Sequence, residues 1–417
     1  MITKLKKFVR KILLMIENTR RRGIPQSFVY AGFKFSRNPF FLKFRQPKLD
    51  KQLEDILNEN SEKPVILSMS LIDWKTPLYQ RTQHIGIQLA KQGYLYFYNT
   101  RNYFDFMDGY RKVSENMYLT NRFDDVYEKL NGRKNKYIHV YSTNMYEDDN
   151  ERIKKAIKDG WKILYEYIDE ISEVISNITI PQYVLDRHER LLKDEEHCYV
   201  IATADKLYKD VAKSRKRNFK LVTNGVVFEH FRDIEKVLPK EMEIVVNQKK
   251  PIIGYYGALA RWFDYKMIKD LANMRKDWNI VLVGWDYDGS FEKTGLRKIN
   301  NVFVVPPVNY HKLPLYAQWF DVCMIPFQIN EVTLSTSPVK LFEYMALGKP
   351  IVTTPMPECK KYKSVLIAEN SAKDFAKKIE EGLKLRGDAK YEDLLKKEAL
   401  ENTWEKKAED IDRLIKD

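Results

Sequence analysis

The second half of the chain contains a short run of residues whose types and spacing suit an anion site. Ser337 is a good helix N-cap, Pro338 suits the first helical position and Gly348 suits the C-terminal cap, so we predict a short helix between them. The free N–H groups and the dipole at such a helix start attract anions, and Lys340 would lie close by. Glu343, one turn further on, could accept hydrogen bonds from sugar hydroxyls of the same ligand. An ordinary helix and strand of an α/β sheet is the alternative interpretation.

The elements that would position this run alternate between strands and helices. Short, continuous apolar segments are typical of buried parallel strands. We expect such strands at residues 64–69, 95–99, 117–119, 137–141, 162–167, 199–202, 220–222, 252–256, 279–284, 302–305, 321–325, 350–353 and 365–368. Helices are expected at residues 81–91, 124–130, 151–158, 182–193, 206–213, 372–385 and 391–416. This alternation predicts an α/β protein with two doubly wound Rossmann-like sheets, whose ligands bind beyond the C-terminal ends of the strands.

Composition agrees with a folded protein of two domains. The chain has 417 residues, 44% of them hydrophobic and 13% aromatic, which is enough for two α/β cores. The three cysteines, Cys198, Cys323 and Cys359, are widely spaced and predict neither a disulfide framework nor a zinc site, so a reducing cytosol is the expected compartment. No apolar run approaches the length of a membrane span.

Positive charge is concentrated at the N-terminus. The formal net charge is +14, and residues 1–47 contain a single acid, Glu17. Apolar residues near the start fall at helical spacing among lysines and arginines: Leu5, Phe8, Val9, Ile12, Leu13 and Ile16. Such a basic amphipathic helix suits the headgroup layer of an anionic membrane. A helix packed on its own domain and a partner-binding helix are the alternatives; nucleic acid is not expected, because no nucleic-acid-binding motif accompanies the charge.

Four ordered motifs between about residues 220 and 355 resemble two-domain glycosyltransferases of the GT-B fold, most of all family 4 and its bacterial cell-surface polysaccharide relatives. The run Ser337–Val352 is similar to their pattern sPxKxxEYxAxGxPVV. The other three matches are Thr223–Val226 with Phe231, Gly254–Asp264, and Leu313–Phe327. The N-terminal half matches by its strand and helix pattern alone.

This resemblance implies a donor-binding domain and an acceptor-binding domain that face each other across a cleft. The expected divisions are a basic amphipathic extension at 1–62, the acceptor domain at 63–232, a linker at 233–250, the donor domain at 251–395 and a helix crossing back to the first domain at 396–417. The donor is expected to be a nucleotide-sugar, with a UDP-sugar favoured, and the acceptor a glycan or a lipid-linked glycan.

The resemblance also assigns donor-binding residues. Gly257 would let the backbone approach the diphosphate, Arg261 and Lys266 would neutralise it, and Glu343 would bind the ribose. A surface salt bridge is the alternative for Lys266. The complete expected donor set is Asn224, Gly257, Arg261, Lys266, Val308, Asn309, Ser337, Pro338, Lys340 and Glu343. No Asp-x-Asp run indicates a metal, so we expect neither a metal nor a cofactor.

The chain departs from the family pattern at Ser335. Retaining members carry a glutamate there, and Glu331 lies four residues too early to replace it, so we favour inversion. An inverting transfer needs a general base in the acceptor domain. Asp169 is the preferred candidate over Asp73, and His84 is a further one. The commoner roles of such residues, a helix cap or structural acid and an ordinary helical histidine, are the alternatives.

The remaining expectations concern the acceptor and the location. Trp74, Tyr79, Arg81 and Glu170 are expected to shape the acceptor pocket, since aromatic rings stack on sugars and arginine binds pyrophosphate. A lipid-linked acceptor and the basic residues 1–47 together favour a cytoplasmic enzyme held peripherally on the inner face of the cell membrane. A non-catalytic subunit of a glycan assembly complex, and a GT-B epimerase or phosphorylase, are the alternative functions.

Overall fold

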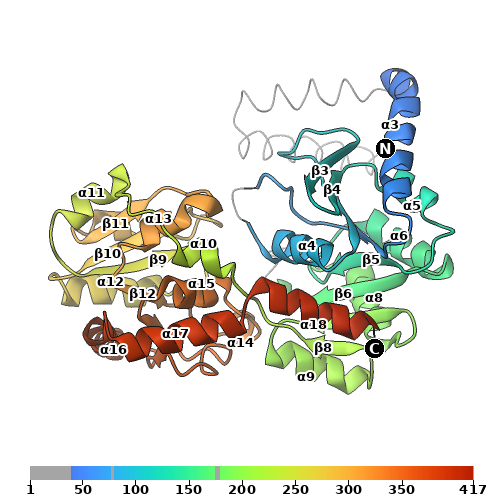
Figure 1. Ribbon diagram of the computed structural model, residues 1–417. Coiled ribbons are helices and arrows are strands. Elements are labelled where there is room, and N and C mark those ends of the chain that lie inside the picture. Colours follow the sequence, from blue (N-terminus) through green and yellow to red (C-terminus); the bar gives the residue numbers. More distant parts are fainter. Residues whose placement is uncertain (1–38, 77–78, 174–178, 417) are drawn as a thin grey trace, which may run out of the picture. The chain divides into compact units, whose positions relative to one another are not determined.

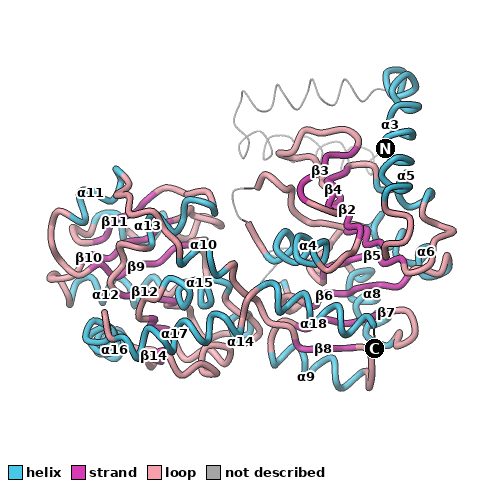
Figure 2. Tube along the Cα trace, viewed as in Figure 1, coloured by secondary structure: helices cyan, strands magenta, loops and turns pink. Residues whose placement is uncertain are grey.

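Strands and helices alternate along the chain, as the sequence predicts (Figures 1 and 2). The structure is a computed structural model that describes residues 39–76, 79–173 and 179–416. Its strands form one sheet of eight strands and one of six. The predicted α/β class with two Rossmann-like sheets is therefore confirmed. The amphipathic helix predicted near the N-terminus lies outside the described residues.

The first sheet has the strand order β3-β4-β2-β1-β5-β6-β7-β8. Its strands are β1 (Val65–Ser68), β2 (Leu95–Asn99), β3 (Tyr110–Ser114), β4 (Met117–Thr120), β5 (Lys136–Tyr141), β6 (Lys162–Tyr167), β7 (Cys198–Ala202) and β8 (Phe219–Leu221). β3 runs antiparallel to β4, whereas β1, β2 and β4 are mutually parallel, as are β6, β7 and β8. All residues of β1 and β2 are buried, which explains why these strands appear in the sequence as unbroken apolar runs.

In the first half of the chain, helices precede and separate the strands of this sheet. They are α3 (Pro39–Glu59), α4 (Arg81–Lys91), α5 (Phe123–Lys129), α6 (Glu147–Lys158), α8 (Gln182–Lys193) and α9 (Asp205–Ser214). α3 was not predicted. It packs against β3 and buries Leu49, Leu53 and Ile56, which are spaced four and three residues apart and so share one helical face. Ordered structure therefore begins earlier in the chain than the predicted start at residue 63.

The second sheet is entirely parallel, with the order β11-β10-β9-β12-β13-β14. Its strands are β9 (Ile252–Tyr256), β10 (Asn279–Val283), β11 (Val302–Val305), β12 (Val322–Ile325), β13 (Ile351–Thr353) and β14 (Val365–Ile367). Gly254 lies in the middle of β9, where a Cβ atom would come within 2.1 Å of the Phe320 ring. The close packing at this point therefore requires a glycine.

In the second half of the chain, helices precede, separate and follow the strands. They are α10 (Phe228–Arg232), α11 (Lys240–Val246), α12 (Tyr265–Met274), η1 (Glu292–Thr294), η2 (Leu296–Lys298), η3 (Tyr310–Lys312), α13 (Leu313–Ala317), α14 (Glu331–Leu334), α15 (Val339–Leu347), α16 (Ala372–Leu385), α17 (Ala389–Glu401) and α18 (Trp404–Lys416). α11 lies inside the segment predicted to be a linker, and it buries Met242 and Val245 in the core.

The closing helix expected over 391–416 is broken between α17 and α18. The main chain of Val226 pairs with both sides of the break: its N–H donates to the carbonyl of Asn402, and its carbonyl accepts from the N–H of Trp404. A Cβ atom at Gly225 would lie 2.8 Å from the Asn402 carbonyl oxygen, so this approach needs a glycine. α18 then packs against α4, β7 and β8, with Trp404 stacked on His84 at a ring separation of 4.8 Å.

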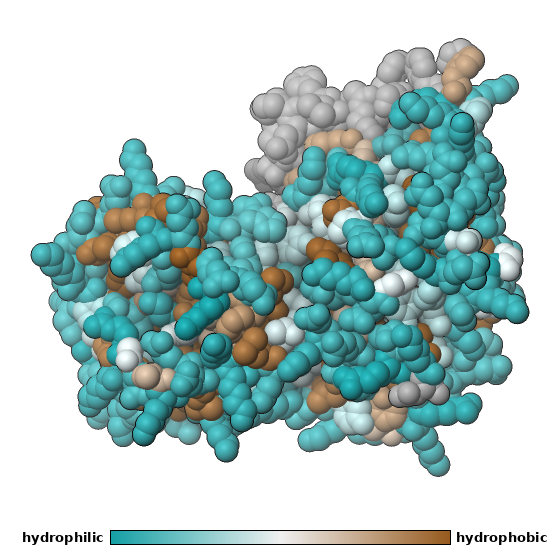
Figure 3. All heavy atoms as spheres, in the orientation of Figure 1, coloured by the Kyte–Doolittle hydropathy of each residue, from teal (hydrophilic) through white to brown (hydrophobic). Residues whose placement is uncertain are grey.

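The chain divides into two compact units, one of residues up to 76 with 93–138 and one of residues 77–92 with 139–417. The division passes through β5. The domain bounds predicted from the sequence remain a prediction. The face drawn in Figure 3 is mostly hydrophilic, with apolar patches over the second sheet and its helices. The helices within the described residues are too short or too polar to span a bilayer.

Candidate active site

A cavity of about 350 Å³ lies within the unit of residues 77–92 and 139–417. Segments that follow strands of both sheets line it, which is where parallel sheets bind ligands. The first sheet and α4 contribute Tyr79, Gln80, Arg81, Ile168 and Asp169. The second sheet and α15 contribute, among others, Gly257, Ala258, Gly284, Trp285, Pro307, Val308, Ser337, Pro338, Lys340 and Glu343. The cavity therefore brings most of the predicted donor residues together with the preferred base.

The start of α15 differs from the prediction by one residue. Pro338, not Ser337, is the N-cap, and the helix begins at Val339 without a side-chain cap. Ser337 is not free to cap because its hydroxyl oxygen accepts a hydrogen bond from the main-chain N–H of Asn224 at 3.3 Å. The predicted C-terminal cap, Gly348, is confirmed, with a left-handed φ of 72°. The uncapped first turn leaves main-chain donors for an anionic ligand.

Lys340 is a half-buried cation in the first turn of α15. Its Nζ lies 4.9 Å from the Phe327 ring centroid and 5.3 Å from that of Tyr255, and among the described residues it has no hydrogen bond or ion pair. Burial lowers the pKa of Lys340 to about 8, against the opposing charge of Glu343. The side chain is therefore mostly protonated at pH 7. A half-buried ammonium without a full counter-charge favours a bound anion.

Glu343 faces the same cavity one turn further along α15. It is 4% exposed, and the hydroxyl of Tyr256 donates to its Oε2 at 2.7 Å. Burial raises the pKa of Glu343 to about 7, although Tyr256 and Lys340 both favour the ionised form. A bound ligand with hydroxyl donors would stabilise the carboxylate further.

Two glycines bring the backbone after β9 and β10 close to Lys340. Gly257 has a φ of 136°, and a Cβ atom there would lie 3.1 Å from Cε of Lys340. A Cβ atom at Gly284 would lie 1.9 Å from the carbonyl oxygen of Gly257. A side chain at Gly257 would occupy space beside the ammonium group, and one at Gly284 would collide with the Gly257 main chain. The predicted close backbone approach at Gly257 thus has a geometric basis, and it depends on Gly284 as well.

Replacing Gly284 with alanine should destabilise the protein. The new methyl group would force the Gly257 segment to move, and overpacking of this kind costs about 1–3 kcal/mol. Urea unfolding measures the change, and the variant Gly132→Ala is a matched control because nothing lies within 4 Å of its new Cβ atom. Equal midpoints for the two variants would contradict the close contact.

Asp169 lies two residues beyond the end of β6 and lines the cavity. Among the described residues its carboxylate has no hydrogen-bond or ion-pair partner. Burial raises the pKa of Asp169 to about 7. A carboxyl group with this pKa can accept a proton at neutral pH, as a general base must. Its role as the general base stays a prediction.

Aromatic side chains form much of the cavity wall. Tyr79 stacks on Tyr310 with ring centroids 5.1 Å apart. Tyr310, Trp285 and Phe327 also line the cavity, although they were not predicted as site residues. Each lies in a segment that follows a strand, which is the signal that could have found them. The predicted acceptor residues Tyr79 and Arg81 also line the cavity.

Three predicted donor residues lie elsewhere. Arg261 is 43% exposed in its side chain and pairs with Asp288 at 3.2 Å, while Lys266 is 87% exposed and pairs with Asp270 at 2.7 Å. The side chain of Asn309 caps η3 by accepting from the main-chain N–H of His311. None of the three is among the residues that line the cavity. For Lys266 the salt-bridge alternative describes the structure, and a phosphate-binding role of Arg261 stays a prediction.

Two of the three candidate bases, Asp73 and His84, are held by contacts that belong to the fold. The Asp73 carboxylate accepts hydrogen bonds from the Thr100 hydroxyl and from main-chain N–H groups of residues 101, 104 and 105. Burial raises its pKa, as it does for Asp169, but this carboxylate is held by its own loop. His84 is buried between Trp404 and Tyr79, and burial lowers its pKa to about 3. The structure thus matches the alternatives of a structural acid and an ordinary helical histidine.

The other two predicted acceptor residues are held by local contacts. The main-chain N–H of Trp74 donates to Asp105 at 2.8 Å. Glu170 forms an ion pair with Lys206 and accepts a hydrogen bond from Ser335 at 3.4 Å. Their acceptor roles stay predictions. In the described part of the chain, no cluster of three or more histidine, cysteine or acidic residues is arranged to hold a metal ion.

The segment that contains the second sheet is similar to a known protein family. The family profile described as "Glycosyl transferases group 1" matches residues 250–384. Residues 250–384 are thus similar to a group 1 glycosyltransferase domain. The matched segment contains β9 to β14 and α15, and with them Gly257, Lys340 and Glu343. The resemblance predicted from the four motifs is therefore confirmed for this domain.

One relative with a curated name is TuaH of Bacillus subtilis (strain 168), provisionally named a teichuronic acid biosynthesis glycosyltransferase. It is 28% identical over 215 residues, which cover 49% of this chain. The match spans about half of that relative, 53% of its length.

Solved structures share the fold over most of the chain. Sucrose-phosphate synthase from Thermosynechococcus elongatus has a TM-score of 0.63 at 15% identity, covering 85% of this chain and 98% of its own. Anabaena HepE in complex with UDP has a TM-score of 0.62 at 13% identity, covering 85% and 99%. WaaG, titled a glycosyltransferase involved in lipopolysaccharide biosynthesis, has a TM-score of 0.54 at 13% identity, covering 84% and 99%. The fold is GT-B, as predicted.

Proposed function

We propose that the protein transfers a sugar from a nucleotide-sugar, most favourably a UDP-sugar, to a glycan or lipid-linked glycan of a bacterial surface polysaccharide. One observation carries the proposal: Asp169 of the first sheet lines the same cavity as Lys340 and Glu343 of α15. A carboxylate able to accept a proton and a cation able to bind a diphosphate therefore share one space.

The proposed reaction inverts the anomeric carbon. An acceptor hydroxyl oxygen attacks that carbon and its proton passes to Asp169. The bond between the anomeric carbon and the donor phosphate oxygen breaks, and its electron pair stays on the nucleoside diphosphate. Lys340 and the first-turn N–H groups of α15 stabilise the added negative charge. Glu343 accepts hydrogen bonds from the ribose hydroxyls. Because these groups supply the charge, activity is expected to persist in EDTA.

Relatives support the donor and the pathway of this proposal. Solved structures of Anabaena HepE contain UDP in one case and UDP-glucose in another. TuaH is named for teichuronic acid biosynthesis and WaaG for lipopolysaccharide biosynthesis, and both of these products are surface glycans. By analogy, we propose the same class of donor and product here.

The experiment that tests the function is a donor screen with purified protein. UDP-, GDP- and dTDP-sugars are offered with and without acceptor extracts, and nucleotide release and product anomer are followed by NMR. Release from one donor class with an inverted product supports the proposal. No release and no donor binding by calorimetry would favour a non-catalytic subunit. A donor sugar that changes configuration without transfer would indicate an epimerase.

UDP affinity should fall as pH rises above about 8. Lys340 has a pKa of about 8 in the free site, so its charge is present below that pH and lost above it. Calorimetric titration of UDP between pH 6.5 and 9.5 measures the effect. The Lys340→Ala variant is the control, since its affinity should lack this transition. A constant affinity of the unchanged protein up to pH 9.5 would contradict the assignment.

We further propose that the basic N-terminal residues hold the protein on the inner, cytoplasmic face of the cell membrane. Residues 1–38 lie outside the described part of the chain, so the proposal depends on their sequence: a basic amphipathic pattern with Glu17 as the one acid. Deleting residues 1–22 should abolish co-sedimentation with phosphatidylglycerol vesicles but not UDP binding. Equal sedimentation of the deleted and full chains would refute membrane contact through this segment.

A further inference from the structure

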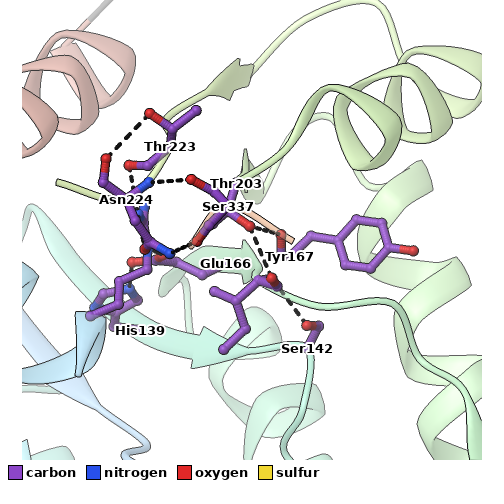
Figure 4. A network of polar contacts seen from close by, with 10 residues as sticks. His139, Ser142, Glu166, Tyr167, Thr203, Thr223, Asn224 and Ser337 are labelled. Atoms are coloured by element: carbon purple, nitrogen blue, oxygen red, sulfur yellow. Dashed lines mark hydrogen bonds and ion pairs between the residues drawn. The ribbon is translucent and has the colours of Figure 1, made fainter. Parts of the chain in front are cut away.

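A buried group of charges lies next to the cavity without lining it. Glu166, on β6, is fully buried, and its two carboxylate oxygens are shared between Arg81 and His139. Arg81 Nε forms an ion pair with Oε2, and His139 Nε2 lies 2.9 Å from Oε1. Figure 4 shows His139 and Glu166 facing each other from their strands. Burial acts to raise the pKa of Glu166, but Arg81 and His139 outweigh it and hold the pKa below its ordinary value.

Such a group is not explained by stability alone. Moving charges out of water costs several kcal/mol per ion, and apolar side chains of similar volume are often equally stabilising. A buried ion pair does fix the position of its members, because each alternative arrangement leaves a charge unpaired. Arg81 and Glu166 are 85 residues apart in the sequence, so their pairing fixes the start of α4 against β6.

The same arginine extends the network toward the donor helix. Its Nη1 donates to the carbonyl of Thr223 at 2.9 Å and to the side-chain oxygen of Asn224 at 3.3 Å. Since that amide oxygen is occupied, the Asn224 NH₂ group points the other way and donates to the carbonyl of Ser337 at 2.6 Å. Figure 4 shows Asn224 between Thr223 and Ser337. Ser337 directly precedes the cap of α15, the helix that carries Lys340 and Glu343.

The other end of the network leads to the proposed base. Glu166 lies three residues before Asp169, and hydrogen bonds hold the segment between them. The Ser142 hydroxyl accepts from the N–H of Ile168 and donates to the carbonyl of Asp169, both at 3.2 Å. The Thr203 hydroxyl donates to the carbonyl of Ile168 at 2.9 Å. Asp169 therefore cannot shift along this segment without breaking contacts with two other strand ends.

We propose that Glu166 and His139 are positioning residues that clamp Arg81, and that Arg81 through Asn224 sets the start of α15 relative to Asp169. This inference goes beyond the proposed function but rests on it for its kinetic consequences. The Glu166 carboxylate, held by His139 at Oε1, fixes the guanidinium through its contact at Oε2, and the guanidinium keeps the Asn224 amide in one orientation. The diphosphate site and the base are thereby held at a fixed separation, which transfer requires and UDP binding does not.

The first test replaces Glu166 with glutamine, which keeps the shape but removes the charge. Because small displacements of reacting groups are costly, kcat for sugar transfer should fall about tenfold to a hundredfold. The Kd of UDP should stay within about threefold, since its ligands on α15 remain. The ascending pH midpoint of kcat/KM should stay near 7, since Asp169 is retained. The Glu398→Gln variant is the control: Glu398 is also buried, on α17, and accepts hydrogen bonds from Lys363 and Ser364 outside the network.

A second pair of variants separates positioning from folding. In His139→Gln an amide can still donate to Glu166, so kcat should stay within about threefold, whereas His139→Ala should lower it as Glu166→Gln does. Hydrogen–deuterium exchange of residues 335–343 should be faster in His139→Ala and Glu166→Gln than in the unchanged protein. Unchanged exchange and kcat in folded His139→Ala protein would overturn the clamp. The exchange result does not need activity, so it decides the clamp even if every donor fails and the proposed function falls.

Discussion

Replacing Lys340 with alanine should lower kcat for sugar transfer by about 10²–10³-fold, the usual cost of removing one preorganised charge-stabilising donor. The ammonium group of this half-buried lysine lies near the Tyr255 and Phe327 rings, which partly shield its field from water. Its interaction strengthens as the leaving diphosphate gains negative charge. The loss should therefore appear in kcat as well as in the Kd of UDP, measured by steady-state kinetics and calorimetry.

A matched variant shows whether the effect belongs to the cavity. Lys269 is an exposed lysine on α12 in the same domain, and Lys269→Ala should leave kcat and the Kd of UDP unchanged. Thermal unfolding of the Lys340→Ala protein should not show a loss of stability, because truncation removes a half-buried charge with no paired counter-ion among the described residues. Turnover equal to that of Lys269→Ala would remove α15 from the donor site.

Most strands could be predicted from the sequence because a buried strand is a short run of mainly apolar residues. β2, β6, β9 and β11 have the predicted bounds, since most of their residues are apolar or aromatic. Short amphipathic segments were harder to recognise. α11 is not evident in the sequence because Met242 and Val245 are two buried side chains among charged neighbours, and their burial depends on the domain core.

Site residues could be predicted where their role depends on the spacing of residues that are close together in the sequence. Lys340 and Glu343 lie about one helical turn apart on α15, so the start of this one helix places both in the cavity. Residues that depend on distant partners could not be placed. Asn224, 113 residues before Ser337, takes the hydroxyl that would otherwise cap α15. Asp288, 27 residues after Arg261, holds that guanidinium at the surface. Neither partner can be read from the motif that contains the residue.

Replacing Asp169 with asparagine should lower kcat by about 10²–10⁴-fold, the range expected when a general base is lost. The amide has nearly the same shape, and the carboxylate has no hydrogen-bond partner among the described residues that the change would disrupt. UDP binding should remain unchanged. A variant that loses proton transfer but keeps donor binding would show that Asp169 acts in the chemical step and not in binding the donor.

The pH profile distinguishes this role from a steric one. Burial raises the pKa of Asp169 to about 7, so the carboxylate that accepts the proton forms as pH rises through 7. The kcat/KM of the unchanged protein, which reports groups of the free enzyme, should therefore rise with pH through a midpoint near 7, and this transition should be absent in Asp169→Asn. Asp148→Asn, a change at an exposed acid on α6, should keep both the rate and the transition. If Asp169→Asn kept the transition, the proton would pass to a different group, and the inverting mechanism would need another base.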